Sequence, residues 1–554
     1  MQNYAIKLFM IIVMIATGNG VFASNLDFYQ EQDQDTTKIP DDWFLHDPET
    51  DHLQGVSSER VYATLLNGKS SRTVLVAVID SGIDTEHEDL KDVIWTNPNE
   101  IAGNGIDDDK NGYIDDIHGW NFIGGKTGNV SDDTYELTRE YVRLKSKFEN
   151  ADEKKISKKE KADYELWTKV KKEFEEESAK AKKQYNFYQT IYENIAFGND
   201  TLKQLLGVTK LNRELLDKIN SQDEKIQIAK GSVAIIFQQA GPDADVEAIL
   251  DELKGAVDHF KIQALYGYNP DFNPRNIVGD NYSDPNEKNY GNNDVKGPEA
   301  THGTHVAGII GANRKNNIGI KGIADNVKIM SVRAVPNGDE RDKDIANAIR
   351  YAVDNGAQII NMSFGKPYSP NKDVVDKAVK YAESKNVLLI HAAGNDSKDD
   401  DVEKNFPNRY FLNGKEAKNW LEIGASAWGA DSDFVAPFSN YGNKSVDLFA
   451  PGVEIYSTTP GNTYKNESGT SMASPSTAGV AAILMSYFPE LSCTQVKDIL
   501  RQSTRKFDNL KVNKPGGNDG EVIEFNKLSN TGGLVNAYEA VKLAQTVKGK
   551  KPEK

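Results

Sequence analysis

The chain has 554 residues, of which 38% are hydrophobic and 27% charged, and its formal net charge is −17 at pH 7. A chain of this length is expected to form more than one structural unit, and its composition is that of a soluble globular protein. The excess of acidic residues argues against a nucleic-acid groove and against an anionic membrane surface as a partner.

The amino terminus has the pattern of a secretory signal. Lys7 precedes a short apolar run, and the sequence Val-Phe-Ala at 21–23 resembles a cleavage site before Ser24. Gly18 and Gly20 interrupt the run before it reaches membrane-spanning length. We therefore expect a signal peptide at residues 1–23, export to a periplasm or out of the cell, and no stable membrane anchor afterwards.

Residues 24–42 form a short acidic segment, and residues 43–125 mix apolar runs with Asp, Asn and Gly clusters. Within the latter, the β-branched and small residues at 74–79 are followed by Gly82. A short, fully apolar run of this kind predicts a buried strand of a parallel sheet.

Residues 126–298 are rich in Lys and Glu and contain two long helical patterns. One helical face of the first pattern carries Trp167, Val170, Phe174, Ala181, Tyr185, Tyr188 and Ile195. The second pattern includes "DVEAILDELKGAVDHFKIQAL". We interpret this zone as an inserted α-helical hairpin that packs on a globular body. A dedicated partner-binding or regulatory device is the alternative.

Residues 299–543 alternate apolar runs with helical stretches, and residues 544–554 form a basic tail. The predicted strands are "VKIMSVRAV", "AQIINMSFG", "NVLLIHAAGN", "WLEIGASA" and "SVDLFAPG", and the predicted helices are "DKDIANAIRYAVDN", "DVVDKAVKYAESK" and "TAGVAAILMSYF". This alternation predicts an α/β fold with a doubly wound, mostly parallel sheet flanked by helices. Asp80, Asn361–Gly365 and Asn395 fall at carboxyl ends of strands, where such folds bind ligands.

Cys493 is the only cysteine, so an intramolecular disulfide is excluded. It lies in "LSCTQVKDIL", a helix-like pattern without a motif that would activate a thiol. We expect a buried, structural side chain.

Two histidines, His302 and His305, lie in "THGTHVAGIIGA". Their spacing could place both on one helical face as metal ligands, but Gly303 and Thr304 stand where a zinc protease would need a glutamate. We prefer one catalytic base at the start of a helix and one structural histidine, with Gly303 allowing another chain segment to approach closely.

Hydrolysis through a serine needs a nucleophile, a base, an acid that orients the base, and donors for the oxyanion. The chain offers Asp80 at the end of a strand, His302 at the start of a helix, Asn395 in "IHAAGND" and Ser471 in "GTSMASP". Each has an ordinary structural explanation on its own: a turn-forming Asp or Asn, or an N-capping Ser.

Taken together, these motifs resemble the subtilisin-like serine peptidases. "VIDSGID", "HGTHVAG" and "GTSMASP" are similar to that family's aspartate, histidine and serine motifs, and they occur in the family's order. The resemblance implies that Asp80, His302 and Ser471 form the triad. It further implies that Asn395 is the oxyanion-hole amide and that His305 is structural.

The family binds its protein or peptide substrate as an added extended strand. "NMSFG" is similar to its substrate-backbone segment, which implies backbone pairing with Ser363, Phe364 and Gly365. The same comparison implies an S1 pocket lined by Ala392, Ala393 and Gly394. Asp396 would favour a basic P1 residue, whereas Lys366 nearby would cancel that preference.

The chain departs from the family pattern in two respects. The helical zone separates Asp80 from His302 far more widely than usual, and only the segment 24–42 stands where an inhibitory prodomain is expected. We hypothesise that the inserted hairpin covers or borders the active-site cleft.

A third feature, "NGIDDDKNGYIDDIHGW", predicts a structural Ca²⁺ site. Its spacing fits the first nine positions of an EF-hand-type loop, but His118 replaces the glutamate expected at the twelfth. The candidate ligands are Asp107, Asp109, Asn111, the Tyr113 carbonyl, Asp115 and Asp116. A solvated acidic turn is the alternative, and Mg²⁺ fits less well because it keeps several waters.

These features predict an exported serine endopeptidase that works through an acyl-enzyme. Two alternatives are a catalytically silent peptidase fold that binds partners through its insertion, and a transferase or ligase that resolves the acyl-enzyme with an amine.

Overall fold

The computed structural model describes residues 39–518 and 520–550. The predicted signal peptide, most of segment 24–42 and the last four residues of the tail lie outside the described residues. The chain divides into two compact units, one formed by residues 39–170 together with the chain from 270 onward, the other by Lys171–Asn269. Among the described residues, no helix is both long and apolar enough to cross a membrane.

The larger unit is built on a nine-stranded sheet in the order β12-β15-β9-β8-β7-β6-β1-β5-β2. Neighbouring strands are parallel, except that β12 pairs antiparallel with β15. The strands are β1 (Val74–Asp80), β2 (Gly119–Asn121), β5 (Val327–Arg333), β6 (Ile359–Met362), β7 (Leu388–Ala392), β8 (Trp420–Ser426), β9 (Leu448–Pro451), β12 (Arg505–Lys506) and β15 (Gly533–Leu534).

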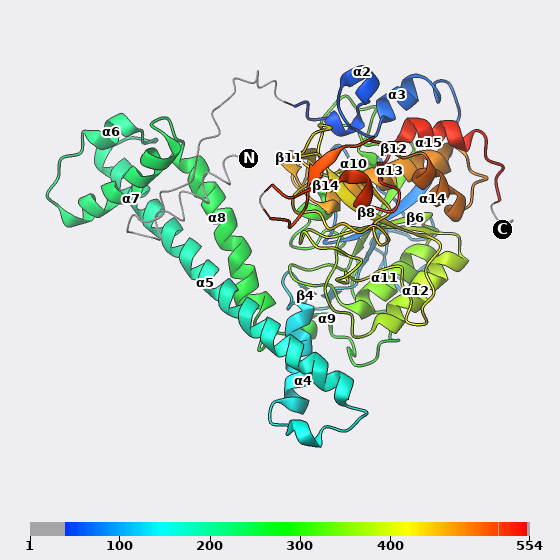
Figure 1. Cartoon of the computed structure of the whole chain (residues 1–554), viewed down its shortest axis with the longest axis horizontal. Helices are drawn as coiled ribbons and strands as arrows, with labels where there is room; N and C mark the ends of the chain where they lie inside the picture. The colour runs from blue at the N-terminus through cyan, green and yellow to red at the C-terminus, as the bar shows by residue number, and fades with distance from the viewer. Residues whose placement is uncertain (1–38, 519, 551–554) are drawn as a thin grey trace. The chain divides into compact units, whose positions relative to one another are not determined.

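Both faces of this sheet are covered by helices. Side chains of a strand alternate between faces, so in β1 Val76 and Val78 enter one hydrophobic core while Ala77 and Ile79 enter another. Helices α10 (Thr301–Gly311) and α13 (Thr470–Tyr487) contribute to the first core. Helices α11 (Asp342–Asp354) and α12 (Lys372–Ser384), which lie side by side in Figure 1, contribute to the second. The predicted doubly wound α/β fold is therefore confirmed.

The other α-helices and strands that lie wholly in this unit are outside the nine-stranded sheet. They are α2 (Pro48–Asp51), α3 (Ser58–Ala63), β3 (Gly124–Gly125), β4 (Gly128–Asn129), α4 (Glu136–Phe148), α9 (Arg275–Val278), β10 (Ile455–Thr459), β11 (Thr463–Glu467), α14 (Cys493–Gln502), β13 (Lys511–Asn513), β14 (Val522–Glu524) and α15 (Ala537–Ala544). Cys493 begins α14 and is buried, as predicted, and burial raises the pKa of its thiol to about 12.

The unit Lys171–Asn269 has a hydrophobic core of its own, to which Ile195, Val233 and Leu253 belong. Its helices are the greater part of α5 (Lys161–Leu206), then α6 (Arg213–Asp217), α7 (Glu224–Ala240) and α8 (Val246–Ile262). Helices α5 and α8 correspond to the two predicted patterns, whereas α6 and α7 were not predicted. Of the face predicted on α5, Trp167, Val170, Phe174, Ala181 and Ile195 are buried, and Tyr185 and Tyr188 are half-buried.

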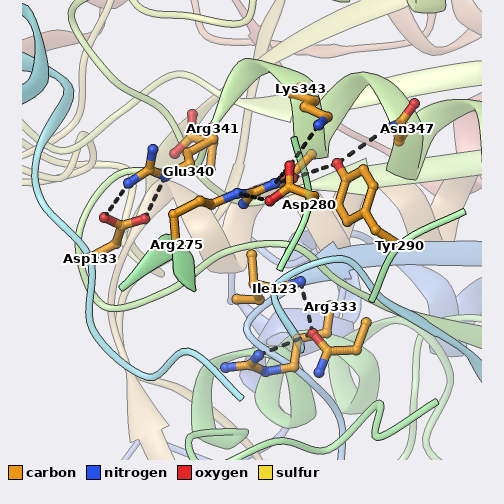
Figure 2. A network of polar contacts seen from close by, with 12 residues as sticks. Ile123, Asp133, Arg275, Asp280, Tyr290, Arg333, Glu340, Arg341, Lys343 and Asn347 are labelled. Carbon is orange, nitrogen blue, oxygen red and sulfur yellow. Dashed lines mark hydrogen bonds and ion pairs between the residues drawn. The ribbon is translucent and has the colours of Figure 1, made fainter. Parts of the chain in front are cut away.

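The rest of the predicted insertion belongs to the larger unit. Arg275 of α9 donates to Asp280 at 2.7 Å and to Asp344 of α11 at 2.6 Å. Lys343 also donates to Asp280, at 2.6 Å (Figure 2). These side chains are buried, so each charge depends on its partner. The predicted domain boundaries at 126 and 298 remain a proposal.

Candidate active site

Asp80 and His302 lie in contact at the carboxyl end of the sheet, although they are 222 positions apart in the sequence. Asp80 ends β1, and its Oδ1 accepts hydrogen bonds from the Ser81 N–H at 2.7 Å and from His302 Nδ1 at 2.7 Å. A Cβ on Gly303 would lie 2.2 Å from the Gly82 carbonyl oxygen. As predicted, this glycine lets α10 approach the neighbouring chain closely.

The carboxylate makes His302 a stronger base. Burial alone lowers the pKa of an imidazole, but the charge of Asp80 and its hydrogen bond outweigh that effect and raise the pKa of His302 to about 9. Since Nδ1 donates to the carboxylate, the neutral ring leaves Nε2 free to accept a proton. The side chain remains 37% exposed, so a second reactant can reach it.

His305 has separate partners. Its Nε2 lies 3.0 Å from the Lys465 carbonyl oxygen of β11, and the ring is fully buried. Burial lowers the pKa of His305 to about 4, so the ring is neutral at pH 7. This contact joins α10 to β11 and is separate from the contact that His302 makes with Asp80.

Ser471 is the second residue of α13. Pro475 lies within this helix and has no N–H, so it cannot donate to the Ser471 carbonyl four residues earlier. That carbonyl instead accepts a hydrogen bond from Ser363 Oγ at 2.9 Å, and the Ser471 hydroxyl lies 3.3 Å from the Ser363 carbonyl. These contacts attach the amino end of α13 to the segment that follows β6. The Ser471 N–H is one of the first N–H groups of the helix, and these groups have no intrahelical acceptor.

Asn395 faces the same helix end. Its side-chain carbonyl accepts hydrogen bonds from the N–H and from the hydroxyl of Thr470, both at 2.9 Å. With the oxygen occupied in this way, the Nδ2 amide is left as the donor. A Cβ on Gly469 would lie 3.5 Å from Asn395 Nδ2 and 3.5 Å from the Ser471 nitrogen, so both donors border the same position.

The predicted S1 segment 392–394 is fixed by two asparagines that the sequence analysis missed. Asn405 Nδ2 and Asn440 Nδ2 donate to the Ala393 carbonyl, at 2.9 and 3.0 Å. A Cβ on Gly365 would lie 2.5 Å from Asn405 Oδ1, so this side chain stands between the predicted substrate-pairing segment and the predicted S1 segment. Both asparagines lie in loops without a recognisable pattern, so no sequence signal pointed to them.

Lys366, which was expected to offset Asp396, is buried elsewhere. Its Nζ contacts Glu136 Oε2 at 2.7 Å and Asp342 Oδ1 at 2.8 Å, and its side chain is 1% exposed. Asp396 is exposed. The positive charge of Lys366 is thus balanced inside its own cluster.

The predicted calcium loop brings together three carboxylates: those of Glu100, Asp109 and Asp116, with ligand atoms within 4.8 Å of one another. Glu100 precedes the recognised motif and was missed. The Asn111 amide donates to Asp109 at 3.1 Å and to Asp116 at 3.0 Å. Burial, with a smaller contribution from the charge of Asp109, raises the pKa of Asp116 to about 6.

The other predicted ligands have different surroundings. The Asp107 carboxylate accepts from the N–H groups of Asn111 and Gly112, and the Asp115 carboxylate accepts from those of Asn104 and Gly105. The Tyr113 ring packs against Trp120, Phe122 and Tyr351. In this structure the side chains of Asp107, Tyr113 and Asp115 therefore hold the conformation of the loop that carries the clustered carboxylates.

Comparison with known proteins identifies the family. The sequence model of the subtilase family matches residues 71–520, most of the chain, and the protein therefore belongs to the subtilase family.

Individual relatives match over shorter stretches. The chain is 45% identical over 186 residues to the thermophilic serine proteinase of Bacillus sp. (strain AK1), covering 33% of this chain and 42% of that protein. It is 36% identical over 214 residues to subtilisin E of Bacillus subtilis (strain 168), covering 38% and 52%. A solved protease structure from Pseudoalteromonas arctica is 26% identical and has a TM-score of 0.37, covering 46% of this chain and 78% of that one. The chain thus spans about half the length of the two curated relatives.

Proposed function

We propose that the protein is an exported serine endopeptidase in which Asp80, His302 and Ser471 are the catalytic residues. The observation that carries the proposal is the 2.7 Å contact between Asp80 and His302, which lies on α10, a helix that packs against the helix that bears Ser471. Membership of the subtilase family supports the same chemistry.

In this mechanism Ser471 Oγ attacks the carbonyl carbon of the scissile bond while its proton passes to His302 Nε2. The oxyanion that forms accepts hydrogen bonds from Asn395 Nδ2 and the Ser471 N–H. Asp80 holds the imidazole through Nδ1 and stabilises its positive charge. When the C–N bond breaks, the departing amine takes the proton from His302, and water then hydrolyses the acyl-enzyme by the same steps.

The substrate is a protein or peptide that pairs with Ser363, Phe364 and Gly365 as an extended strand, with its P1 side chain beside Ala392–Gly394. Exposed backbone after a strand end provides the hydrogen-bonding groups for such pairing. Cleavage of a peptide library by the purified protein, with the Ser471→Ala variant as control, tests the proposal. Library cleavage by the parent alone would support it, and equal turnover by both proteins would refute it.

We also propose that Glu100, Asp109 and Asp116 hold a structural Ca²⁺ ion. Three carboxylates this close repel one another unless a cation or a proton intervenes, and an all-oxygen set suits a hard cation. The ion would stabilise the loop that precedes β2 and would take no part in the reaction.

A further inference from the structure

A cavity of about 770 Å³ lies in the larger unit, outside the catalytic residues. Its walls come mainly from the ends of the inserted zone and partly from the family body. Representative wall residues are Arg139 and Val142 of α4, Leu166 of α5, Phe272, Tyr282 and Pro370. The cavity exceeds the volume of a single side chain, and nothing in the catalytic mechanism uses it.

The charged groups of the wall have ion-pair partners of opposite charge. Arg341 donates to Asp133 through two hydrogen bonds of 2.7 and 2.8 Å, as Figure 2 shows. Arg139 forms an ion pair of 2.8 Å with Glu136. Because these two pairs are compensated and largely buried, they hold the wall in place. Arg143 and Asp163, which also line the cavity, are 50% and 46% exposed and pair with Glu140 and Lys147.

The surface left for a ligand is mixed, and apolar side chains make up a large part of it. Val142 of α4 is 42% exposed, although its side chain is apolar. Pro370 is exposed as well, and Leu166 and Phe272 are half-buried. Apolar surface gathered in a concave site gains free energy by covering an apolar side chain.

The cavity wall is linked to the proposed substrate strand by chain connectivity and by one ion pair. Ser363 contacts the backbone of Ser471, and the chain then passes through Gly365 to Lys366. Lys366 makes its 2.7 Å ion pair with Glu136, which is itself a wall residue of the cavity. Pro370, four residues further on, also lines the cavity. The segment that follows the proposed substrate strand therefore leads to the wall of this cavity.

We propose that the cavity is a remote substrate subsite, built by the inserted zone, that binds an apolar or aromatic side chain of the peptide several residues from the scissile bond. The inference rests on the proposed endopeptidase function, and it assigns to residues 134–166 and 270–282 a role in selecting substrates.

Peptides with one fixed scissile bond test this subsite. Each carries a single Phe, or Gly as reference, at one position roughly four to eight residues from that bond on either side, a reach of ~13–26 Å in extended chain. In the parent, Phe at one register is expected to raise kcat/KM over Gly by about tenfold, the factor that corresponds to ~1.4 kcal/mol of apolar burial.

Val142→Glu and Leu166→Ala should remove this gain while leaving kcat/KM for a short peptide unchanged. Val522→Glu is the matched control, since Val522 is 52% exposed on β14 and does not line the cavity. A parent that gains nothing from Phe at any register, or a gain that survives in both cavity variants, would overturn the subsite. Failure of the parent to cleave even the short peptide would instead refute the proposed function.

Discussion

Lys366 and Glu136 form a buried ion pair of 2.7 Å between the residue that follows the proposed substrate strand and the first residue of α4. Their side chains are 1% and 3% exposed. Two charges removed from water in this way stay stable only as a pair. The inserted zone is thus coupled energetically to the segment beside Ser471.

We expect Glu136→Gln to destabilise the protein by roughly 3 kcal/mol at neutral pH, because it leaves Lys366 and Arg139 short of one buried partner. Burial alone raises the pKa of Glu136, but the charges of Arg139 and Lys366 outweigh this and lower it from 4.5 to about 2. The stabilisation that the ionised Glu136 carboxylate gives to the folded state is therefore complete above pH 4.5 and is lost as the pH falls toward 2. Urea unfolding of both proteins across this range, in a Ser471→Ala background, measures the difference.

The double variant Glu136→Gln, Lys366→Met is the control for this pair. Removing both charges should recover part of the lost stability, since no unpaired lysine remains. Equal destabilisation of the single variant at neutral pH and near pH 2 would show that Glu136 acts through packing rather than charge.

The pH dependence of peptide cleavage should follow His302. Only the neutral imidazole can take the Ser471 proton, so kcat/KM should rise with pH and level off above about 9. Asp80→Asn removes the charge that raises this pKa, so the apparent pKa should fall while kcat drops about 10⁴-fold. A pH–rate profile that is flat between neutrality and pH 9 would contradict the raised pKa of His302.

Asn395→Ala should lower kcat by about 10²–10³-fold with little change in KM, because the amide binds the oxyanion only as it forms. Thr470→Val deletes one of the two hydrogen bonds that hold the Asn395 carbonyl. A smaller loss of kcat is expected there, since the Thr470 N–H still binds the amide. Steady-state kinetics of both variants on one peptide give the comparison, and an Asn395→Ala enzyme with parental kcat would exclude this donor.

Calcium should raise the melting temperature of the parent, and EDTA should lower it. Asp109→Asn and Glu100→Gln should abolish most of that difference. Asp108→Asn is the matched control, because the Asp108 carboxylate accepts from the Ile101 N–H and the Asn104 amide and is not one of the three clustered carboxylates. Identical melting temperatures of the parent in EDTA and in excess calcium would remove the metal proposal.

Replacing residues 171–269 by a flexible linker should leave the larger unit folded. The pairs Arg275–Asp344 and Lys366–Glu136 lie entirely in the retained chain. Deleting residues 126–298 removes Arg275 and Glu136 and should give an unfolded or insoluble protein. Thermal melts of the two deletion proteins compare these two sets of boundaries. If both proteins were equally unstable, the division at 171 and 269 would be contradicted.

If the hairpin borders the cleft, as hypothesised, the shorter deletion should cleave folded proteins faster while leaving short peptides unaffected. Unchanged activity on both kinds of substrate would count against that hypothesis.

Much of the fold could be predicted because its strands are short apolar runs and its helices amphipathic. The run at 74–79 became β1, and the runs near 360 and 390 became β6 and β7. Helix α13 begins earlier than its apolar pattern, at Thr470, because small residues with little hydrophobic signal form its first turns. Its start is visible only through the serine motif.

The parts of the site that could not be predicted depend on contacts between distant loops. Asn405 and Asn440 reach Ala393 from separate loops, and Glu100 joins Asp109 from outside the acidic motif. Lys366 seemed to neighbour Asp396 by sequence comparison, whereas it is buried against Glu136 of the inserted zone. Such pairings follow from tertiary packing and carry no local periodicity.

In the proposed mechanism, Ser471 is an assembled and accessible nucleophile. Intact mass after treatment with a fluorophosphonate, for the parent and for Ser471→Ala, tests it most directly. We predict a single adduct on the parent and none on the variant. A folded, calcium-loaded parent that gains no adduct, or a variant that is labelled equally, would contradict it.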